Sequence, residues 1–347
     1  MHAALKASGV SFEVIQAMEI NPTVLSTYMH NFPDTFAAPR NIESITAEEI
    51  NELNINVIVM SPPCQPFCRT GRKLDIQDAR SSSLAHLLSI LPDVNFQYLL
   101  VENVKGFEES DARDALIDAV TKCNMHWQEF LLTPVTVGVP NSRLRYYLLA
   151  KRVDLKWCFE PSKTIMTGVP MWGSLEMPYG PIVTDHKEIW REYRTQAEKS
   201  GNINTELGPD EWCVGDILEN GDMDTYAIPT KLISKYGIAM DIVSYDSVKT
   251  NCFTKGYGNF IKGTGSYIAQ VKVDDDTVLG NPDGDIFDKL VTMKLRYFTP
   301  REVARLMCYT DDFTFPPKLS MKQKYRALGN SINVYVVAIL LSILLSD

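Results

Sequence analysis

The sequence predicts an α/β fold in which a mostly parallel sheet carries helices on both faces, beside a smaller irregular lobe. Two observations support this fold. Short apolar runs alternate with helical patterns over the first 150 or so residues, as in βαβ units. From about residue 153 to 288 glycine, proline and charges are interspersed, and regular patterning returns only afterwards. We therefore expect a sheet domain over 1–152, a lobe over 153–288, and a C-terminal segment, 289–347, that returns to the sheet domain.

Five apolar runs of the sheet domain are predicted strands. Runs this short, bounded by turn residues or charges, are typical of buried strands. Glu19 ends the first run and Glu102 follows the third, so both acids are expected at carboxyl ends of strands. The runs cover residues 14–18, 57–60, 98–101, 127–132 and 144–150.

Helix-start signals separate these strands. Pro22 stands at a favoured first-turn position, and Thr46 begins a capping-box pattern. Leucines between 84 and 91 repeat at helical spacing, and residues 112–123 are amphipathic.

The C-terminal segment has equally clear helix signals. Thr299 and Ser320 each begin a capping-box pattern, and Gly329 is a plausible helix stop. The run 333–345 is apolar on most sides and predicts a buried helix, since it is too short to cross a bilayer. We expect no membrane association.

Composition narrows the functional classes. The net charge of −9 argues weakly against a protein that coats nucleic acid by charge alone. Basic clusters occur at 69–73 and 318–326, where a solvated face is the simpler interpretation. The seven cysteines include no C-x-x-C pair, which argues against a zinc cluster, and no metal is expected. Free thiols and no secretory pattern in residues 2–8 predict a reducing compartment: the cytoplasm, with the nucleus as a second location.

Cys64 is the most informative residue. It follows the predicted strand 57–60 and lies among Pro62, Pro63 and Pro66, which stiffen the loop. Ligands of open α/β sheets bind at such carboxyl edges, and a nucleophile needs a rigidly held thiol there. A small buried cysteine explains the loop alone about equally well.

Three further segments suit the same chemistry. Glu102 lies at a strand end, Arg143 and Arg145 are spaced to share one face of a strand, and 329–331 lies between two helices. A thiolate that adds to carbon 6 of a cytosine makes carbon 5 nucleophilic, and a carboxyl group at ring nitrogen 3 stabilises the developing charge. Arginines can hold the base oxygen and a phosphate. Taken singly, each of these residues is better explained in a simpler way, Glu102 as a helix-capping acid and Arg143 with Arg145 as a surface ion pair.

Together and in this order, the motifs Pro62-Pro63-Cys64-Gln65, 102–104, 143–145 and 329–331 resemble those of the cytosine-5 methyltransferase family. The resemblance extends over nearly the whole chain. Residues 252–257, 105–107 and 296–300 resemble the branch that methylates tRNA for aspartic acid. The implied fold is a Rossmann-like, S-adenosylmethionine-dependent methyltransferase sheet, with 1–152 catalytic and the lobe 153–288 recognising the target.

The resemblance also implies individual roles. The nucleophile would be Cys64, and Glu102 would contact ring nitrogen 3, with Asn103 supporting its loop. Arg143 and Arg145 would position the flipped base and its backbone. The target-recognition residues would be Cys252, Phe253 and Thr254.

For the cofactor, S-adenosylmethionine, Glu19 would bind the ribose hydroxyls, and an acid ending a strand suits that role independently. Ile42 and Glu43 would lie beside the adenine. The remaining cofactor contacts would come from Ser61, Asn330 and Ser331.

One feature departs from the family. Its members begin with a strand and a glycine-rich turn that holds the methionine end of the cofactor. Residues 1–5 here resemble the helix after that turn, so we expect this chain to lack the first strand, to bind the cofactor poorly and to turn over little.

Three functions remain open. The first is methylation of carbon 5 of a cytosine in tRNA, at position 38 in the anticodon loop of tRNA-Asp, through a covalent cysteine adduct. The second is cytosine-5 methylation of DNA, and the third is a catalytically silent tRNA-binding protein. We expect a monomer whose partner is tRNA.

Overall fold

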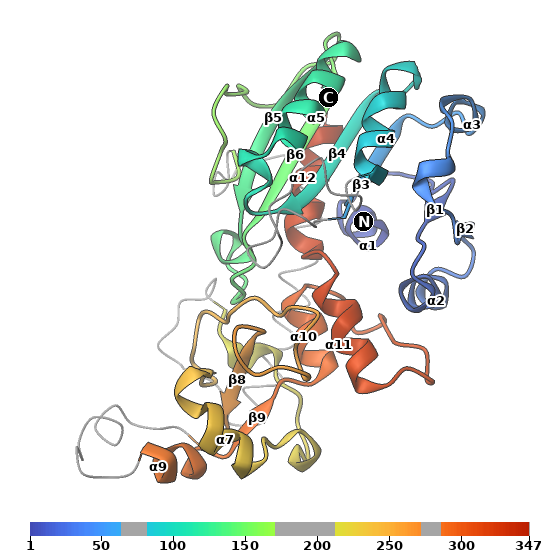
Figure 1. Cartoon of the computed structure of the whole chain (residues 1–347). Helices are drawn as coiled ribbons and strands as arrows, with labels where there is room; N and C mark the ends of the chain where they lie inside the picture. Colours follow the sequence, from blue (N-terminus) through green and yellow to red (C-terminus); the bar gives the residue numbers. More distant parts are fainter. Residues whose placement is uncertain (64–81, 171–211, 272–285, 347) are drawn as a thin grey trace. The chain divides into compact units, whose positions relative to one another are not determined.

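A computed structural model of the chain describes residues 1–63, 82–170, 212–271 and 286–346 (Figure 1). They belong to two compact units. The first unit comprises Met1–Thr133, Leu144–Val183 and Val334–Asp347, and the second comprises Pro134–Arg143 and Thr184–Asn333. These bounds differ from the predicted parts 1–152, 153–288 and 289–347. Helices α10 (Pro300–Leu306) and α11 (Met321–Gly329) belong to the second unit, and only the last helix returns to the first.

The first unit contains two sheets. Strands β1 (Ala17–Met18) and β2 (Ala37–Ala38) pair in parallel. The other sheet has the order β3-β4-β6-β5. Its strands are β3 (Val57–Met60), β4 (Tyr98–Val104), β5 (Met125–Leu132) and β6 (Arg145–Arg152).

The larger sheet is more mixed than predicted. Strands β3 and β4 are parallel, but β6 is antiparallel to both β4 and β5. The reason is the connection between β5 and β6. It contains the short turn η6 (Pro134–Val137) and no described α-helix, whereas a parallel return needs a long crossover.

Helices cover both faces of this sheet, as predicted. On one face, α4 (Ser82–Ile90) and α5 (Asp111–Lys122) form a continuous apolar core with the sheet. Leu88 and Leu116 meet Leu99 and Leu148 in this core. On the other face, α12 (Val334–Leu345) contacts β4 and β6, and α1 (His2–Ala7) packs on α12.

The predicted helix starts are confirmed. Pro22 is the first residue of α2 (Pro22–Asn31), where the Asn21 side chain caps the helix. Thr46 and Glu49 form a complete capping box at α3 (Ala47–Glu52). Short 3-10 turns of this unit are η1 (Ile42–Ser44), η4 (Leu91–Asp93) and η5 (Phe107–Glu109).

Helix α12 is buried, as its apolar sequence predicted, and its residues 334–344 are all buried. The helical stretch Met321–Leu345 is long and apolar enough to cross a membrane by length and composition alone. Since 78% of its most apolar window is buried, it has the character of a core helix.

The second unit is built from short elements around a three-stranded sheet. The strand order is β7-β8-β9, with β7 parallel and β9 antiparallel to β8. These strands are β7 (Asp241–Val243), β8 (Ser266–Ala269) and β9 (Leu295–Tyr297). The other elements are α7 (Thr230–Tyr236), α9 (Ile286–Thr292), η7 (Val214–Ile217), η8 (Asp224–Tyr226) and η9 (Gly237–Ala239).

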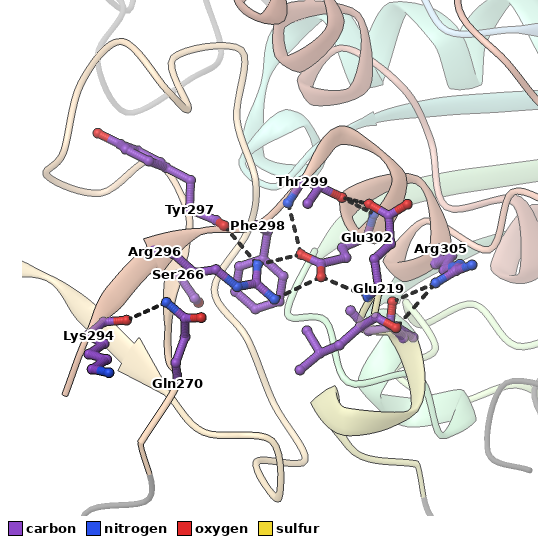
Figure 2. Close-up of polar contacts among 12 residues, drawn as sticks. Glu219, Ser266, Gln270, Lys294, Arg296, Tyr297, Phe298, Thr299, Glu302 and Arg305 are labelled. Atoms are coloured by element: carbon purple, nitrogen blue, oxygen red, sulfur yellow. Dashed lines mark hydrogen bonds and ion pairs between the residues drawn. The ribbon is translucent and has the colours of Figure 1, made fainter. Parts of the chain in front are cut away.

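A buried ion pair fixes the start of α10 (Figure 2). The Arg296 guanidinium donates to both carboxylate oxygens of Glu302 at 2.8 and 2.9 Å. Glu302 also closes the predicted capping box with Thr299 and accepts from the Glu219 backbone N–H at 2.9 Å. The Glu302 side chain is fully buried, so this carboxylate depends on protein partners alone.

Candidate functional site

Two side chains hold the carboxyl group of Glu102, which lies near the end of β4. Ser61 directly follows β3, the parallel neighbour of β4, and its hydroxyl donates to Glu102 Oε2 at 2.5 Å. Arg145 opens β6, and its Nε lies 3.4 Å from Glu102 Oε1. The parallel register of β3 and β4 therefore brings Ser61 beside Glu102, a contact that the sequence did not predict.

The Glu102 carboxyl group is mostly buried but keeps some contact with solvent. The side chains of Glu102 and Arg145 are 8% and 16% exposed, and Ser61 is exposed. A carboxyl group in such a position can accept a hydrogen bond, or donate one when protonated, at a ring nitrogen of a ligand.

Asn103 follows Glu102 and is buried. Its side-chain oxygen accepts from the backbone N–H of Val104 at 2.9 Å, which fixes the amide close to the strand. Its Nδ2 has no hydrogen-bond partner among the residues that the structure describes. The amide therefore stiffens the strand end that carries Glu102.

Cys64 lies outside the described residues, and so does Cys68. The described part of the predicted loop ends at Pro63. As predicted, strand β3 stops at Met60, directly before Ser61.

Arg143 does not share a strand with Arg145, contrary to the expectation from their spacing. Strand β6 begins only at Arg145, so the alternation of a strand does not apply to Arg143. Arg143 belongs to the second unit, and its residue is 3% exposed.

The Arg143 guanidinium instead joins two segments of the second unit. It donates to the backbone oxygens of Phe253 and Gly329 at 3.2 Å each, and also to that of Ser331. Its Nη1 lies 3.4 Å from the Cys252 sulfur. The predicted recognition residues 252–254 and the 329–331 turn are therefore brought together by one arginine.

Residues 252–254 are held in place by the packing of Phe253 and by a backbone hydrogen bond of Thr254. The ring of Phe253 is buried and makes edge contacts with Tyr257 and Phe298, at centroid distances of 4.8 and 5.2 Å. The backbone N–H of Thr254 donates to Thr264 at 2.9 Å. Phe253 is thus a core residue of the second unit, while Cys252 and Thr254 are partly exposed.

Asn330 and Ser331 end helix α11. Asn330 is its exposed C-cap, and the Ser331 hydroxyl is 2.6 Å from the hydroxyl of Tyr309. Loss of hydration raises the pKa of Tyr309, opposed by its hydrogen bond to Ser331 and by the charge of Arg143. Tyr309 was not predicted, because nothing in the sequence links two residues this far apart.

The predicted ribose and adenine contacts lie after neighbouring parallel strands. Glu19 follows β1 and Ile42 and Glu43 form part of η1, which follows β2. Glu19 Oε1 accepts from the Asn21 N–H at 2.7 Å, and Glu43 Oε1 accepts from the Ser83 hydroxyl at 3.1 Å. Both acids therefore lie at the carboxyl edge of this two-stranded sheet.

Among the described residues, no group of three or more His, Cys, Asp or Glu side chains is placed to hold a metal ion. The polar groups at the predicted positions within each unit are carboxylates, hydroxyls and guanidinium groups, which can bind an organic ligand.

Known proteins resemble this chain over nearly its full length. The profile of the C-5 cytosine-specific DNA methylases matches residues 1–345. A protein of Mus musculus named tRNA (cytosine(38)-C(5))-methyltransferase is 38% identical over 374 residues, covering 99% of this chain and 90% of the mouse protein. A protein of Dictyostelium discoideum named DNA (cytosine-5)-methyltransferase is 36% identical over 362 residues, covering 100% of this chain and 91% of that protein.

A solved structure agrees with these sequence matches. The crystal structure of a mutant DNMT2 from Spodoptera frugiperda has a TM-score of 0.78 at 37% identity, covering 99% of this chain and 96% of that one. The predicted methyltransferase fold is thereby confirmed. With a profile match to residues 1–345 and relatives above one-third identity, this chain belongs to the C-5 cytosine-specific DNA methylase family, as its motifs predicted.

Proposed function

We propose that this chain transfers a methyl group from S-adenosylmethionine to carbon 5 of cytosine 38 in the anticodon loop of tRNA-Asp. The observation that carries the proposal is the 38% identity, over 99% of the chain, to a protein named for methylation at cytosine 38 of tRNA. The choice of tRNA-Asp follows from the branch resemblance of residues 252–257. Unpaired loop bases are the usual targets of proteins that read RNA, which supports this substrate.

The proposed chemistry begins with Cys64. Its thiolate forms a bond to carbon 6 of the cytosine, and the electron pair of the ring double bond makes carbon 5 nucleophilic. Glu102, held by Ser61 and Arg145, provides the proton or hydrogen bond that ring nitrogen 3 needs as charge develops. After carbon 5 has been methylated, it loses its proton, the double bond re-forms, and the thiolate leaves.

Two arginines have different parts in this proposal. Arg145 lies beside Glu102 and is partly exposed, so it can hold the base and its phosphate. The buried guanidinium of Arg143 is surrounded by backbone oxygens. We assign to Arg143 the positioning of residues 252–254 against Asn330 and Ser331.

S-adenosylmethionine, when bound, supplies an electrophilic methyl group. The donor set at the edge of β1 and β2 fits its nucleoside. Glu19 uses Oε1 for the Asn21 N–H, which fixes the carboxylate and leaves Oε2 to accept from ribose hydroxyls. Ile42 is partly exposed and can cover an adenine face, with Glu43 beside it. The cofactor roles of Ser61, Asn330 and Ser331 stay predictions from the family resemblance.

The test is transfer of a labelled methyl group to a tRNA-Asp transcript, by this chain and by a version extended with the family's first strand and glycine-rich turn. The product base is located by mass spectrometry. We expect 5-methylcytosine at position 38 and none in a matched transcript with uracil there. Cys64→Ala should abolish transfer, whereas Cys68→Ser, four residues away, should retain it. Label in the uracil-38 transcript, or full activity of Cys64→Ala, would contradict the proposal.

DNA is the second candidate substrate, because the Dictyostelium relative is named as a DNA methyltransferase. A duplex target requires the cytosine to be flipped out of the stack, at a cost that a loop base does not carry. A duplex tested beside tRNA-Asp at equal concentration separates the two, and faster methylation of the duplex would favour DNA.

A further inference from the structure

An exposed aromatic ring stands out on the second unit. Phe260 is 64% exposed, whereas most aromatic side chains around it are buried. It lies in residues 251–265, hereafter the Phe260 loop, between Lys255 and Lys262, which are both exposed. Single exposed apolar residues are common on proteins, so exposure alone does not mark Phe260 as a binding residue.

The first relevant property is that the backbone of Phe260 is fixed. Its N–H donates to the Gly256 oxygen at 2.9 Å, and its own oxygen accepts from the Thr264 hydroxyl at 2.6 Å. The next residue, Ile261, is buried, and its oxygen accepts from the buried Tyr267 hydroxyl at 2.8 Å. The ring is therefore presented to solvent from a rigid base, which lowers the entropy lost on binding.

The second property is the charge of the sequence on either side of Phe260. The sequence contains no Asp or Glu between Asp246 and Asp274, although the whole chain has a net charge of −9. Lys255 and Lys262 are therefore the charges nearest to Phe260 along the chain. A positive, acid-free stretch in an acidic protein favours an anionic ligand.

The third property is the helix that packs on this loop. A β-carbon at Gly329, the last residue of α11, would lie only 2.1 Å from the Lys255 backbone nitrogen. One at Gly258 would lie 2.7 Å from the Tyr325 ring. Helix α11 thus abuts the Phe260 loop and brings the exposed Lys322 to the same part of the unit.

We propose that Phe260 is a stacking platform for an unpaired base of the RNA substrate other than the target cytosine, with Lys255 and Lys262 binding the flanking phosphates. This inference rests on the proposed function and adds a specific contact to it. Proteins that bind single-stranded RNA combine such rings with basic grooves, because every base has a face that can stack.

The test compares Phe260→Ala, Phe260→Trp and the wild type for binding to tRNA-Asp. A matched control is Ile238→Ala, which removes a side chain that is 83% exposed in η9 of the same unit. Loss of one stacked base should weaken binding about 5- to 150-fold. Phe260→Trp should restore affinity, and Ile238→Ala should leave it unchanged.

Two further measurements distinguish stacking from a structural effect. The slope of log affinity against log salt should stay the same in Phe260→Ala, because no charge is lost, but should fall by about 1 in Lys262→Ala. Affinity for a fully paired RNA duplex should not differ between the wild type and Phe260→Ala. In transfer assays Phe260→Ala should raise KM for tRNA and leave kcat unchanged.

Equal tRNA affinity of Phe260→Ala and the wild type would refute the proposed stacking role of Phe260. So would an equal loss on duplex RNA, or failure of the tryptophan variant to restore binding. These outcomes are separate from a failure of the proposed function, which appears as absent methyl transfer both by the wild type and by a version extended with the family's first strand and glycine-rich turn. Binding that depends on Phe260, without transfer by either version, would refute the proposed function and keep the RNA contact.

Discussion

Breaking the buried Arg296–Glu302 pair should destabilise the second unit severely. Glu302→Ala removes a carboxylate that accepts hydrogen bonds from Nη1 and Nη2 of Arg296. The same carboxylate accepts from the backbone N–H groups of Thr299 and Glu219. The Arg296 side chain, which is only 4% exposed, would be left with an uncompensated charge. Removing one partner of such a pair costs about 3–5 kcal/mol, a large share of the roughly 5–15 kcal/mol that stabilises a domain.

The control variant breaks the ion pair of another arginine, which lies on the same helix as Glu302. Arg305 of α10 pairs with Asp311 in equally good geometry, at 3.0 and 3.1 Å, but the Asp311 side chain is 48% exposed. Solvent screens this pair, so Asp311→Ala should cost only about 0–1 kcal/mol. Urea unfolding, followed by circular dichroism, measures both variants. Equal midpoints for Glu302→Ala and Asp311→Ala would refute the argument that burial decides the cost.

Other substitutions test the remaining geometry. Gly329→Ala would place a β-carbon 2.1 Å from the Lys255 backbone nitrogen. We therefore expect a lower melting temperature and weaker tRNA binding. An unchanged melting temperature would show that the two backbone segments can move apart at little cost in free energy. Ser61→Ala removes the hydrogen bond to Glu102 and should lower kcat about tenfold or more with little change in KM for tRNA, which initial rates would show. Burial raises the pKa of the Cys213 thiol from 9.0 to about 11, so the folded chain keeps a proton that the unfolded chain loses. Stability should therefore fall as the pH rises from about 9 towards 11, and Cys213→Ala should flatten that slope.

Local signals in the sequence predicted local structure well. The capping boxes at Thr46, Thr299 and Ser320 all form, because their hydrogen bonds join residues three apart. The alternation of apolar runs and helices also gave the correct class of fold. Strand β1 is shorter than predicted, Ala17–Met18 rather than 14–18, since pairing with β2 limits its length.

The site was predictable only in part, for a physical reason. The sequence placed Glu102 at a strand end, and the structure adds that Ser61 meets it there because parallel strand ends share one edge. Arg143 was misplaced on a strand, because its partners are backbone oxygens of Phe253 and Ser331, more than a hundred residues away. Tyr309 was missed for the same reason. Such contacts depend on tertiary packing and leave no periodic signal.

The proposed reaction is covalent methyl transfer by Cys64 to a tRNA cytosine. A tRNA-Asp carrying 5-fluorocytosine at position 38 tests it most directly, because fluorine at carbon 5 cannot leave as a proton does and the thiolate adduct persists. With S-adenosylmethionine present, we predict a denaturation-stable protein–tRNA complex whose linked peptide contains Cys64, and no complex with Cys64→Ala. A stable complex joined through Cys68 or Cys252, or none with the wild type, would contradict this account.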